Sequence, residues 1–433
     1  MKESGSAQRE AASASGTTEA PAFPSDAEII AVGSELLTHD RIDTNSLFLT
    51  EQLNAIGIEV RRKLIVGDDR PRLESAIRHA LAHVRVLILT GGLGPTEDDL
   101  TREAVAAALD RRLVFSDQIF GWIEERFRRI RRPMADNNRR QAYLIEGAEP
   151  LPNPRGTAPG QWILHGDCAI MLLPGPPGEL KPLFTSEGLP RLARRLPPQV
   201  IRTRYYRVAG MGESELDHLI APIYTQVQNP ATTILSGAGD IQVHLRARAN
   251  TAEQAESLLA AIAPQIETLL GDRIYSRNGD LLEAVVGQKL RAAHATLAVA
   301  ESITGGLMAQ RITTIPGASD YFLGGFLVYT NQMKTALLGV DPALIEKHTA
   351  VSAEVACAMA EGARARTGAT YALSITGEAG PESSSGAAPG TVFIGFCGPG
   401  HVEAREVQFG GDRNRIRALA AQTALDFLRR RLN

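Results

Sequence analysis

Uninterrupted hydrophobic runs that end in glycine and lead into helical stretches recur along the chain. Residues 27–37 read AEIIAVGSELL, and residues 86–108 read VLILTGGLGPTEDDLTREAVAAA. A continuous apolar run predicts a strand buried on both faces, and a glycine loop followed by a helical pattern predicts a βα unit. Repetition of these units over residues 26–195 predicts a parallel sheet with helices on both faces.

The hydrophobic pattern changes between residues 200 and 275. The segments TRYYRVAG, TTILSGA and DIQVHLRARA alternate apolar and polar positions, as half-buried strands do, and two helical stretches accompany them. Helical and apolar stretches alternate again over residues 278–433. The expected fold class is therefore α/β, with two three-layer α/β/α domains joined by a small α+β module.

Composition narrows the class of protein. Residues 1–25 are rich in Ser, Ala, Gly and Pro and have no apolar core, so we expect a disordered tail and no secretory signal. The net charge of -3 gives no basic excess for nucleic acid, and no apolar run could span a membrane. The three cysteines, Cys168, Cys357 and Cys397, form no metal or disulfide pattern. We expect a cytoplasmic protein.

The stretch LAVAESITGGLMA over residues 297–309 places a serine between a predicted strand and a predicted helix. Ser302 follows the strand, and Thr304, Gly305 and Gly306 lead into the helix. A helix N-terminus offers free N–H groups that suit an oxyanion or a phosphate. A serine there still needs a base. The alternative is that Ser302 and Thr304 only cap the helix.

Two further predicted strands end in polar side chains. Tyr329, Asn331 and Lys334 follow one strand, and Thr376 and Gly377 end another. Strand ends of an α/β sheet form its ligand-binding edge, so these residues are expected to share a rim with the serine. A desolvated lysine can accept a proton and a tyrosine can relay one. Taken alone, the lysine is better explained as a solvated surface residue.

The loop TGGLGPTEDDLT over residues 90–101 combines glycines with carboxylates. N–H groups of Gly91, Gly92, Gly94 and Thr96 can cradle phosphate oxygens. Carboxylates can hold a hard divalent cation such as Mg²⁺, and a metal beside a phosphate loop suits attack on a pyrophosphate. The candidate metal ligands are Glu35, Asp43, Asp98 and Asp99. The alternative is that Asp98 and Asp99 cap the following helix.

Residues 298–340, together with SITGEAGP, PGTVFIGF and FGGDRNRIR, resemble the C-terminal domain of the competence/damage-inducible protein CinA family. That resemblance implies a nicotinamide-nucleotide amidohydrolase, which converts nicotinamide mononucleotide to nicotinic acid mononucleotide and ammonia without a cofactor. It implies Ser302 as the nucleophile, with Lys334 and Tyr329 assisting. Thr376 would line the amide pocket, and Arg413 would bind the substrate phosphate.

Two residues depart from the pattern of that family. Ile303 stands where cysteine is common, and we expect its branched side chain to crowd the nucleophile. Glu378 stands where a small or apolar residue is usual, and it brings a negative charge toward a site for a phosphate-bearing substrate. One hypothesis is therefore that one of the two sites is inactive.

The motifs AVGSELL, TGGLGPTEDDLT and LPGPPGEL resemble the N-terminal domain of the same family, which shares the fold of molybdopterin-binding proteins. The resemblance implies a metal-dependent pyrophosphatase acting on ADP-ribose and related dinucleotides, a KH-like module over residues 200–275, and a homodimer. The segments GMGE and GAGD do not form the GXXG loop that RNA binding needs. The expected function is pyridine nucleotide salvage on small nucleotide substrates. The alternative is a non-catalytic partner in competence or the DNA damage response.

Overall fold

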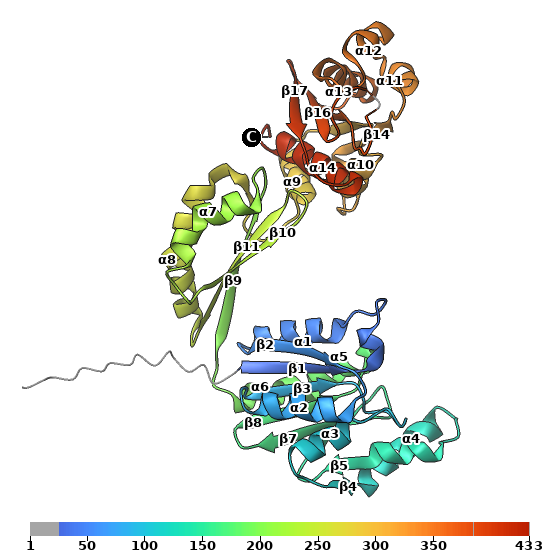
Figure 1. The fold of residues 1–433 in the computed structure, drawn as a ribbon, viewed down its shortest axis with the longest axis vertical. Helices are drawn as coiled ribbons and strands as arrows, with labels where there is room; N and C mark the ends of the chain where they lie inside the picture. The colour runs from blue at the N-terminus through green and yellow to red at the C-terminus, as the bar shows by residue number, and fades with distance from the viewer. Residues whose placement is uncertain (1–25, 384, 433) are drawn as a thin grey trace, which may run out of the picture. The chain divides into compact units, whose positions relative to one another are not determined.

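The computed structural model describes residues 26–383 and 385–432, so the expected disordered tail lies outside the described residues. The chain divides into two compact units, one ending at Ile201 and one beginning at Arg202. Figure 1 labels the helices and strands of both.

A six-stranded sheet in the order β2-β1-β3-β8-β7-β6 forms the centre of the first unit. Its strands are β1 (Asp26–Val32), β2 (Glu59–Val66), β3 (Val86–Thr90), β6 (Glu149–Leu151), β7 (Gly160–His165) and β8 (Cys168–Leu173). The strands β2, β1, β3 and β8 run parallel, as predicted, whereas β7 and β6 are antiparallel. Only residues 166 and 167 connect β7 to β8, and so short a turn joins antiparallel strands.

Helices cover both faces of this sheet and bury alternate residues of its strands. These helices are α1 (Thr44–Ala55), α2 (Arg70–Leu81), α3 (Thr101–Ala108), α5 (Pro177–Leu183) and α6 (Leu189–Arg195), whereas α4 (Asp117–Arg129) lies outside them. Ile29 of β1 packs with α1, α5 and α6, and its neighbour Ile30 packs with α2 and α3. The three-layer α/β/α prediction is confirmed. The helix expected directly after the glycine of AVGSELL is only a 3-10 turn, Ser34–Leu37.

Outside these layers, α4 packs beside a two-stranded sheet of β4 (Leu113–Phe115) and β5 (Tyr143–Ile145). The remaining irregular helices of this unit are η2 (Asp136–Ala142) and the π-helix η3 (Phe184–Gly188).

The second unit starts with the α+β module. Its sheet has the order β10-β11-β9-β12, built from β9 (Val200–Val208), β10 (Ala231–Ser236), β11 (Ile241–Ala249) and β12 (Ile274–Ser276). The helices α7 (Glu213–Tyr224) and α8 (Ala252–Leu270) pack on this sheet around Tyr206, Val243 and Ile266. The α+β prediction for this segment is confirmed.

The rest of the second unit is another three-layer domain. Its five-stranded sheet has the order β14-β13-β15-β16-β17, built from β13 (Leu297–Glu301), β14 (Phe322–Leu327), β15 (Tyr371–Gly377), β16 (Thr391–Gly398) and β17 (His401–Gln408). The strands β14, β13 and β15 are parallel, and β16 and β17 are antiparallel. The helices α9 (Leu282–Ala292), α10 (Leu307–Thr313) and α14 (Arg413–Arg429) pack on one face, and α11 (Asn331–Leu338), α12 (Pro342–His348) and α13 (Ala353–Thr367) pack on the other.

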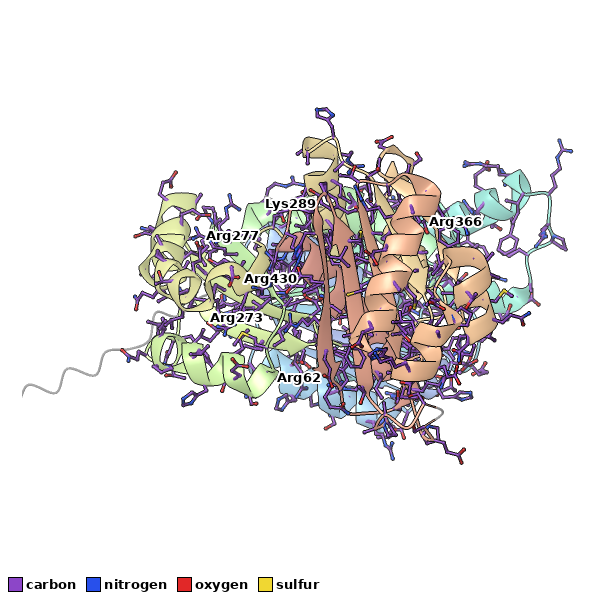
Figure 2. The ribbon with its side chains drawn as sticks, turned by 90° about the horizontal axis from the view of Figure 1, so that it is seen from above. Arg62, Arg273, Arg277, Lys289, Arg366 and Arg430 are labelled. Atoms are coloured by element: carbon purple, nitrogen blue, oxygen red, sulfur yellow. The ribbon has the colours of Figure 1, made fainter. Side chains whose placement is uncertain are left out.

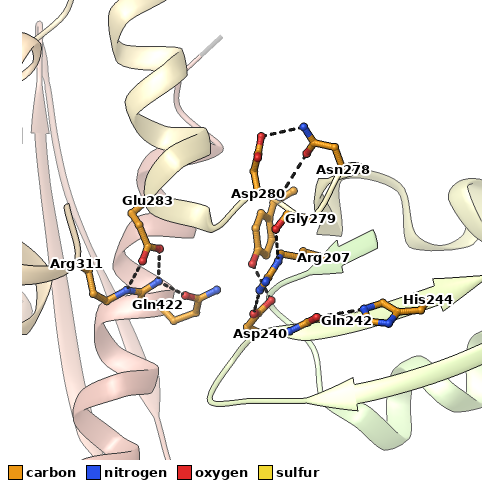
Figure 3. A network of polar contacts seen from close by, with 11 residues as sticks. Arg207, Asp240, Gln242, His244, Asn278, Gly279, Asp280, Glu283, Arg311 and Gln422 are labelled. Atoms are coloured by element: carbon orange, nitrogen blue, oxygen red, sulfur yellow. Dashed lines mark hydrogen bonds and ion pairs between the residues drawn. The ribbon is translucent and has the colours of Figure 1, made fainter. Parts of the chain in front are cut away.

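Polar contacts tie the α+β module to this domain (Figure 3). Arg207 of β9 donates to the carbonyl of Gly279 at 2.8 Å and forms an ion pair with Asp240, which lies in the turn GAGD. Tyr275 donates to the same carboxylate at 2.7 Å. The GAGD turn therefore holds the segment that leads into α9.

Basic side chains are spread over both units, and the six labelled in Figure 2 come from different parts of the chain. Four of these form ion pairs: Arg62 with Glu28, Arg273 with Glu215, Arg277 with Glu267, and Arg430 with Asp272 and Asp426. Much of the positive charge is thus compensated locally. Across residues 26–383 and 385–432, no helix combines the length and the apolar character needed to cross a bilayer.

Candidate functional site

The end of β13 fixes Ser302 at the edge of the C-terminal sheet. The N–H of Ser302 donates to the carbonyl of Ile375 in β15 at 3.0 Å, and Glu301 accepts from the N–H of Val328 at 2.8 Å on the other side. Ser302 is therefore held between its two parallel neighbours, where the ends of all three strands meet.

Lys334 lies directly beside the serine. Its Nζ donates to Ser302 Oγ at 3.2 Å, and its side chain is 2% exposed. In the described part of the chain, Lys334 forms no ion pair with a carboxylate. Burial without a counter-charge disfavours the ammonium, and it lowers the pKa of the Lys334 amine. The interpretation of Lys334 as a solvated surface residue is wrong.

A cavity of about 680 to 700 Å³ opens in each α/β domain, and the one in the C-terminal domain is called the Ser302 pocket. Its walls include the predicted residues Ser302, Tyr329, Asn331, Lys334, Thr376, Gly377 and Arg413. The structure thus brings together seven predicted residues from three strand ends and the start of α14.

Tyr329 and Arg413 form a pair in the wall of the Ser302 pocket. Arg413 donates to the Tyr329 hydroxyl at 2.7 Å and to the carbonyl of Gly380 at 3.1 Å. Tyr329 is 58% exposed, and no hydrogen bond joins it to Ser302 or Lys334 in the described structure. The buried hydroxyl of Thr376 donates to the carbonyl of Ala350 at 2.7 Å. Of the two candidates for a direct base, only Lys334 is in hydrogen-bond contact with the serine.

The N-terminus of α10 is already occupied by a side chain of the protein. The buried carboxylate of Glu301 accepts from the N–H groups of Gly306, Met308 and Ala309 at 3.0, 3.0 and 2.8 Å. Thr304, Gly305 and Gly306, which we expected to bind substrate, do not line the Ser302 pocket. The reason is that the glutamate before Ser302 folds back over the turn and satisfies these donors, as acidic groups do at helix N-termini.

The two departures from the family pattern occupy different environments. Ile303 is buried and packs in the hydrophobic core that includes Val299 and Met308, while also forming part of the pocket wall. Glu378 lines the same pocket, and its Oε1 accepts from the N–H of Ser385 at 2.7 Å. The Ile303 side chain therefore fills core volume, whereas Glu378 adds a carboxylate to the pocket.

The cavity in the N-terminal domain, called the glycine-loop pocket, lies at the ends of the parallel strands. All eight residues predicted for this site line it: Glu35, Asp43, Gly91, Gly92, Gly94, Thr96, Asp98 and Asp99. Glu35 and Asp43 come from the segment between β1 and α1, and the other six residues come from the loop between β3 and α3. Both segments start at the same edge of the sheet.

Buried polar contacts hold the glycine loop in shape. Gly91 and Gly92 have φ angles of +95° and +65°, in the left-handed region that glycine tolerates. Thr101 donates to the carbonyl of Gly91 at 2.8 Å. The buried guanidinium of Arg102 donates to the carbonyls of Leu93 and Gly94 at 2.7 and 3.0 Å. Because these carbonyls accept from Arg102, the backbone of the glycine loop is held in one conformation along the cavity.

Two of the four candidate metal ligands already accept hydrogen bonds. Asp43 Oδ1 accepts from the N–H of Ser46 at 3.0 Å and caps α1, and Asp99 Oδ2 accepts from the N–H of Thr96 at 2.9 Å. Among the described residues, no three His, Cys, Asp or Glu side chains gather closely enough to hold a metal by themselves. Each of these two carboxylates keeps its other oxygen, so the set fits a cation that also takes water or phosphate oxygens.

Sequence reasoning missed two residues of this pocket, Asn45 and Glu179. Asn45 donates to the carbonyl of Gly175 at 2.7 Å, and its buried Oδ1 has no partner among the described residues. The signal was the motif RIDTNS, in which Asn45 is the second residue of a helix that starts at the pocket. Glu179 lies in the motif LPGPPGEL, which carried the resemblance but was not assigned to the site.

The fold defines a three-part chain with an α/β domain at each end and a KH-like module between them. Family models match in this order: "Probable molybdopterin binding domain" over residues 28–194, "Damage-inducible protein CinA KH domain" over 203–276, and "CinA C-terminal domain" over 280–432. A CinA-like protein of Solibacter usitatus is 59% identical over 408 residues, covering 94% of this chain and 98% of its own. The chain belongs to the CinA family.

A second relative in sequence agrees with this assignment. A CinA-like protein of Koribacter versatilis is 47% identical over 411 residues, covering 94% of this chain and 99% of its own. Among solved structures, the CinA protein of Thermoplasma acidophilum is 30% identical, with a TM-score of 0.36, and the match covers 38% of this chain and 97% of that one.

Proposed function

We propose that the C-terminal domain hydrolyses the carboxamide of nicotinamide mononucleotide, giving nicotinic acid mononucleotide and ammonia. The observation that carries this proposal is the 3.2 Å contact between the buried Lys334 amine and Ser302 Oγ in the wall of a cavity. A nucleophile in contact with a desolvated base is the arrangement that activates a serine.

In the proposed reaction, the neutral Lys334 amine takes the proton from Ser302 as Oγ attacks the amide carbon. The carbonyl oxygen becomes an oxyanion, for which the N–H of Ile303 is the proposed donor. Ile303 lines the pocket next to Ser302, and its N–H has no acceptor in the described structure. The Lys334 ammonium then gives its proton to the leaving nitrogen, so the C–N bond breaks and ammonia departs. Water hydrolyses the resulting ester and restores Ser302.

The substrate phosphate is assigned to Arg413. Its guanidinium is part of the pocket wall and is oriented by Gly380 and Tyr329, and a guanidinium pairs well with phosphate oxygens. The helix N-terminus of α10 is not used for this purpose, because Glu301 occupies it.

Ammonia release from nicotinamide mononucleotide tests this function. Ser302→Ala and Lys334→Ala are expected to abolish release while the fold is retained in thermal melting. Lys289→Ala is the matched control, since Lys289 contacts the carbonyl of Leu432 and is not part of the Ser302 pocket. Absence of release by the folded wild type would reject the proposal and favour a site made inactive by Glu378.

We propose a second activity for the N-terminal domain, the metal-dependent hydrolysis of the pyrophosphate bond in ADP-ribose-like dinucleotides. The supporting observation is that the glycine loop and four carboxylates line one cavity. Glu35, Asp43, Asp98 and Asp99 would hold a cation such as Mg²⁺, which when bound would neutralise phosphate charge. The N–H groups of the glycine loop would cradle the phosphates.

The second activity is tested by following AMP and ribose 5-phosphate released from ADP-ribose. Release is expected with Mg²⁺ and not with a chelator, and Asp98→Asn is expected to reduce it. Ammonia release by the C-terminal domain in the same samples is the internal control. Failure of both reactions in the folded protein would favour the alternative, a non-catalytic partner in competence or the DNA damage response.

A further inference from the structure

A second cavity of about 270 Å³ lies next to the glycine-loop pocket in the N-terminal domain. It is formed between α4 and the loop of residues 152–159, and it is called the Trp122 pocket. Its wall contains the indole of Trp122, the side chains of Ile119 and Ile123, and Pro154. Trp122 is 37% exposed, so part of its indole is open to a ligand.

The loop of residues 152–159 is a common wall of the two cavities. Thr157 lines both of them. Asn153 lines the Trp122 pocket and donates to Glu179 Oε2 at 2.7 Å, while Glu179 lines the glycine-loop pocket. At Gly156 an added Cβ would lie 1.8 Å from the same Glu179 oxygen, so the loop backbone packs directly against that carboxylate. A single layer of residues therefore separates the two cavities.

The loop is also held in place from the α4 side. Arg126 of α4 donates to the carbonyl of Pro154 at 2.8 Å and also to the carbonyl of Arg155. Asn153 Oδ1 accepts from the N–H groups of Arg155 and Gly156 at 3.0 and 2.9 Å. The wall is thus fixed by hydrogen bonds on both sides and does not depend on a ligand to form.

The size and lining of the Trp122 pocket select a flat, partly apolar group. Pockets for whole drug-sized ligands measure about 300–1,000 Å³, so this cavity suits one ring system and not a whole dinucleotide. An exposed indole offers a stacking face, which every nucleobase can use. Pro152, Pro154 and Pro159 contribute apolar contact, and Glu125, Arg126 and Arg129 add charged groups to the same wall.

We propose that the Trp122 pocket binds the purine base of a dinucleotide whose pyrophosphate lies in the glycine-loop pocket. The inference rests on the proposed pyrophosphatase function and adds a base-binding subsite to it. The base stacks on Trp122, and the ribose passes Thr157, which borders both cavities. This subsite would make the N-terminal domain prefer adenine-bearing pyrophosphates to pyrophosphates without a base.

The test compares two probes that resist hydrolysis, α,β-methylene ADP-ribose and methylenediphosphonate, which lacks the base. Affinities are measured by calorimetry with Mg²⁺ for wild type, Trp122→Ala and Trp122→Phe. Trp122→Ala is expected to weaken binding of the adenine-bearing probe by about 5- to 150-fold, the effect of removing one stacking aromatic ring. Binding of methylenediphosphonate is expected to stay unchanged, and Trp122→Phe is expected to keep most of the affinity.

Tryptophan fluorescence gives a readout that does not depend on a variant. The chain has only two tryptophans, and the other one, Trp162, is buried in the core. Quenching of wild-type emission by the adenine-bearing probe, absent in Trp122→Phe, supports the inference. Wild type that binds both probes equally, or binds the adenine-bearing probe without quenching, would overturn this subsite alone. Binding of neither probe would overturn the pyrophosphatase proposal as well.

Discussion

Replacement of Lys334 by methionine removes the amine and keeps most of the length and apolar contact of the side chain. In the described structure this amine is the one ionisable group that hydrogen-bonds Ser302 Oγ, at 3.2 Å. Its loss should leave the serine without a base. A positioned general base contributes about 10²- to 10⁴-fold to a rate. At 1.36 kcal/mol for each factor of ten, this is about 2.7–5.4 kcal/mol of lost transition-state stabilisation.

Although Lys334→Met should lose activity, its folded state should not lose stability. The pKa of buried Lys334 is lowered from 10.5, so between its folded and unfolded pKa values the unfolded chain binds a proton that the folded chain does not. The free energy of unfolding of the wild type therefore increases with pH across that window. It decreases as the pH drops from the unfolded pKa to the folded pKa of Lys334. Lys334→Met lacks this dependence and should be at least as stable as the wild type at neutral pH.

The assay is ammonia release from nicotinamide mononucleotide as a function of pH, with urea denaturation measured in parallel. Wild-type activity should increase with pH as the Lys334 ammonium loses its proton, and reach a plateau above the folded pKa. Lys334→Met should be inactive and stable. A folded Lys334→Met protein with more than a tenth of wild-type activity, about 1.4 kcal/mol of lost stabilisation, would refute the role of Lys334 as base.

Three other substitutions have distinct expected outcomes. Glu301→Gln replaces the carboxylate that accepts three N–H bonds by an amide, and it should lower the free energy of unfolding by about 1–3 kcal/mol in urea denaturation. An unchanged urea midpoint would contradict the role of Glu301 as the cap of α10. Arg413→Met should raise KM for nicotinamide mononucleotide about 10-fold or more with little change in kcat, whereas the neighbouring Arg415→Met should change neither. Arg102→Met removes the donors that hold the glycine loop and should reduce ADP-ribose hydrolysis, measured as AMP release, while ammonia release persists.

The layers of both α/β domains could be predicted from the sequence, because buried parallel strands such as residues 86–90 are continuous apolar runs. The antiparallel strands β6 and β7 could not be predicted in this way. The direction of β7 depends on the short turn around Gly166, and that of β6 depends on the loop of residues 152–159. An apolar run reads the same in either direction. The 3-10 turn at Ser34–Leu37 was likewise expected as a helix, because both begin after the same glycine.

The candidate sites were predictable where strand ends share an edge. Gly91 and Ser302 could be located in their pockets because each directly follows a buried strand, and Asp98 because it lies in the loop that follows β3. The carboxylate of Glu301 was not recognised as the ligand of the α10 N-terminus, because its side chain turns back across four residues. The burial of Lys334 depends on packing from several elements, which no single stretch of sequence encodes.

The most direct test of the central claim is ammonia release from nicotinamide mononucleotide by wild type and by Ser302→Ala at equal concentration. We expect release by the wild type and none by the variant, with an ester of nicotinic acid mononucleotide on Ser302 in the mass spectrum of quenched wild-type enzyme. Equal ammonia release by folded Ser302→Ala would contradict it.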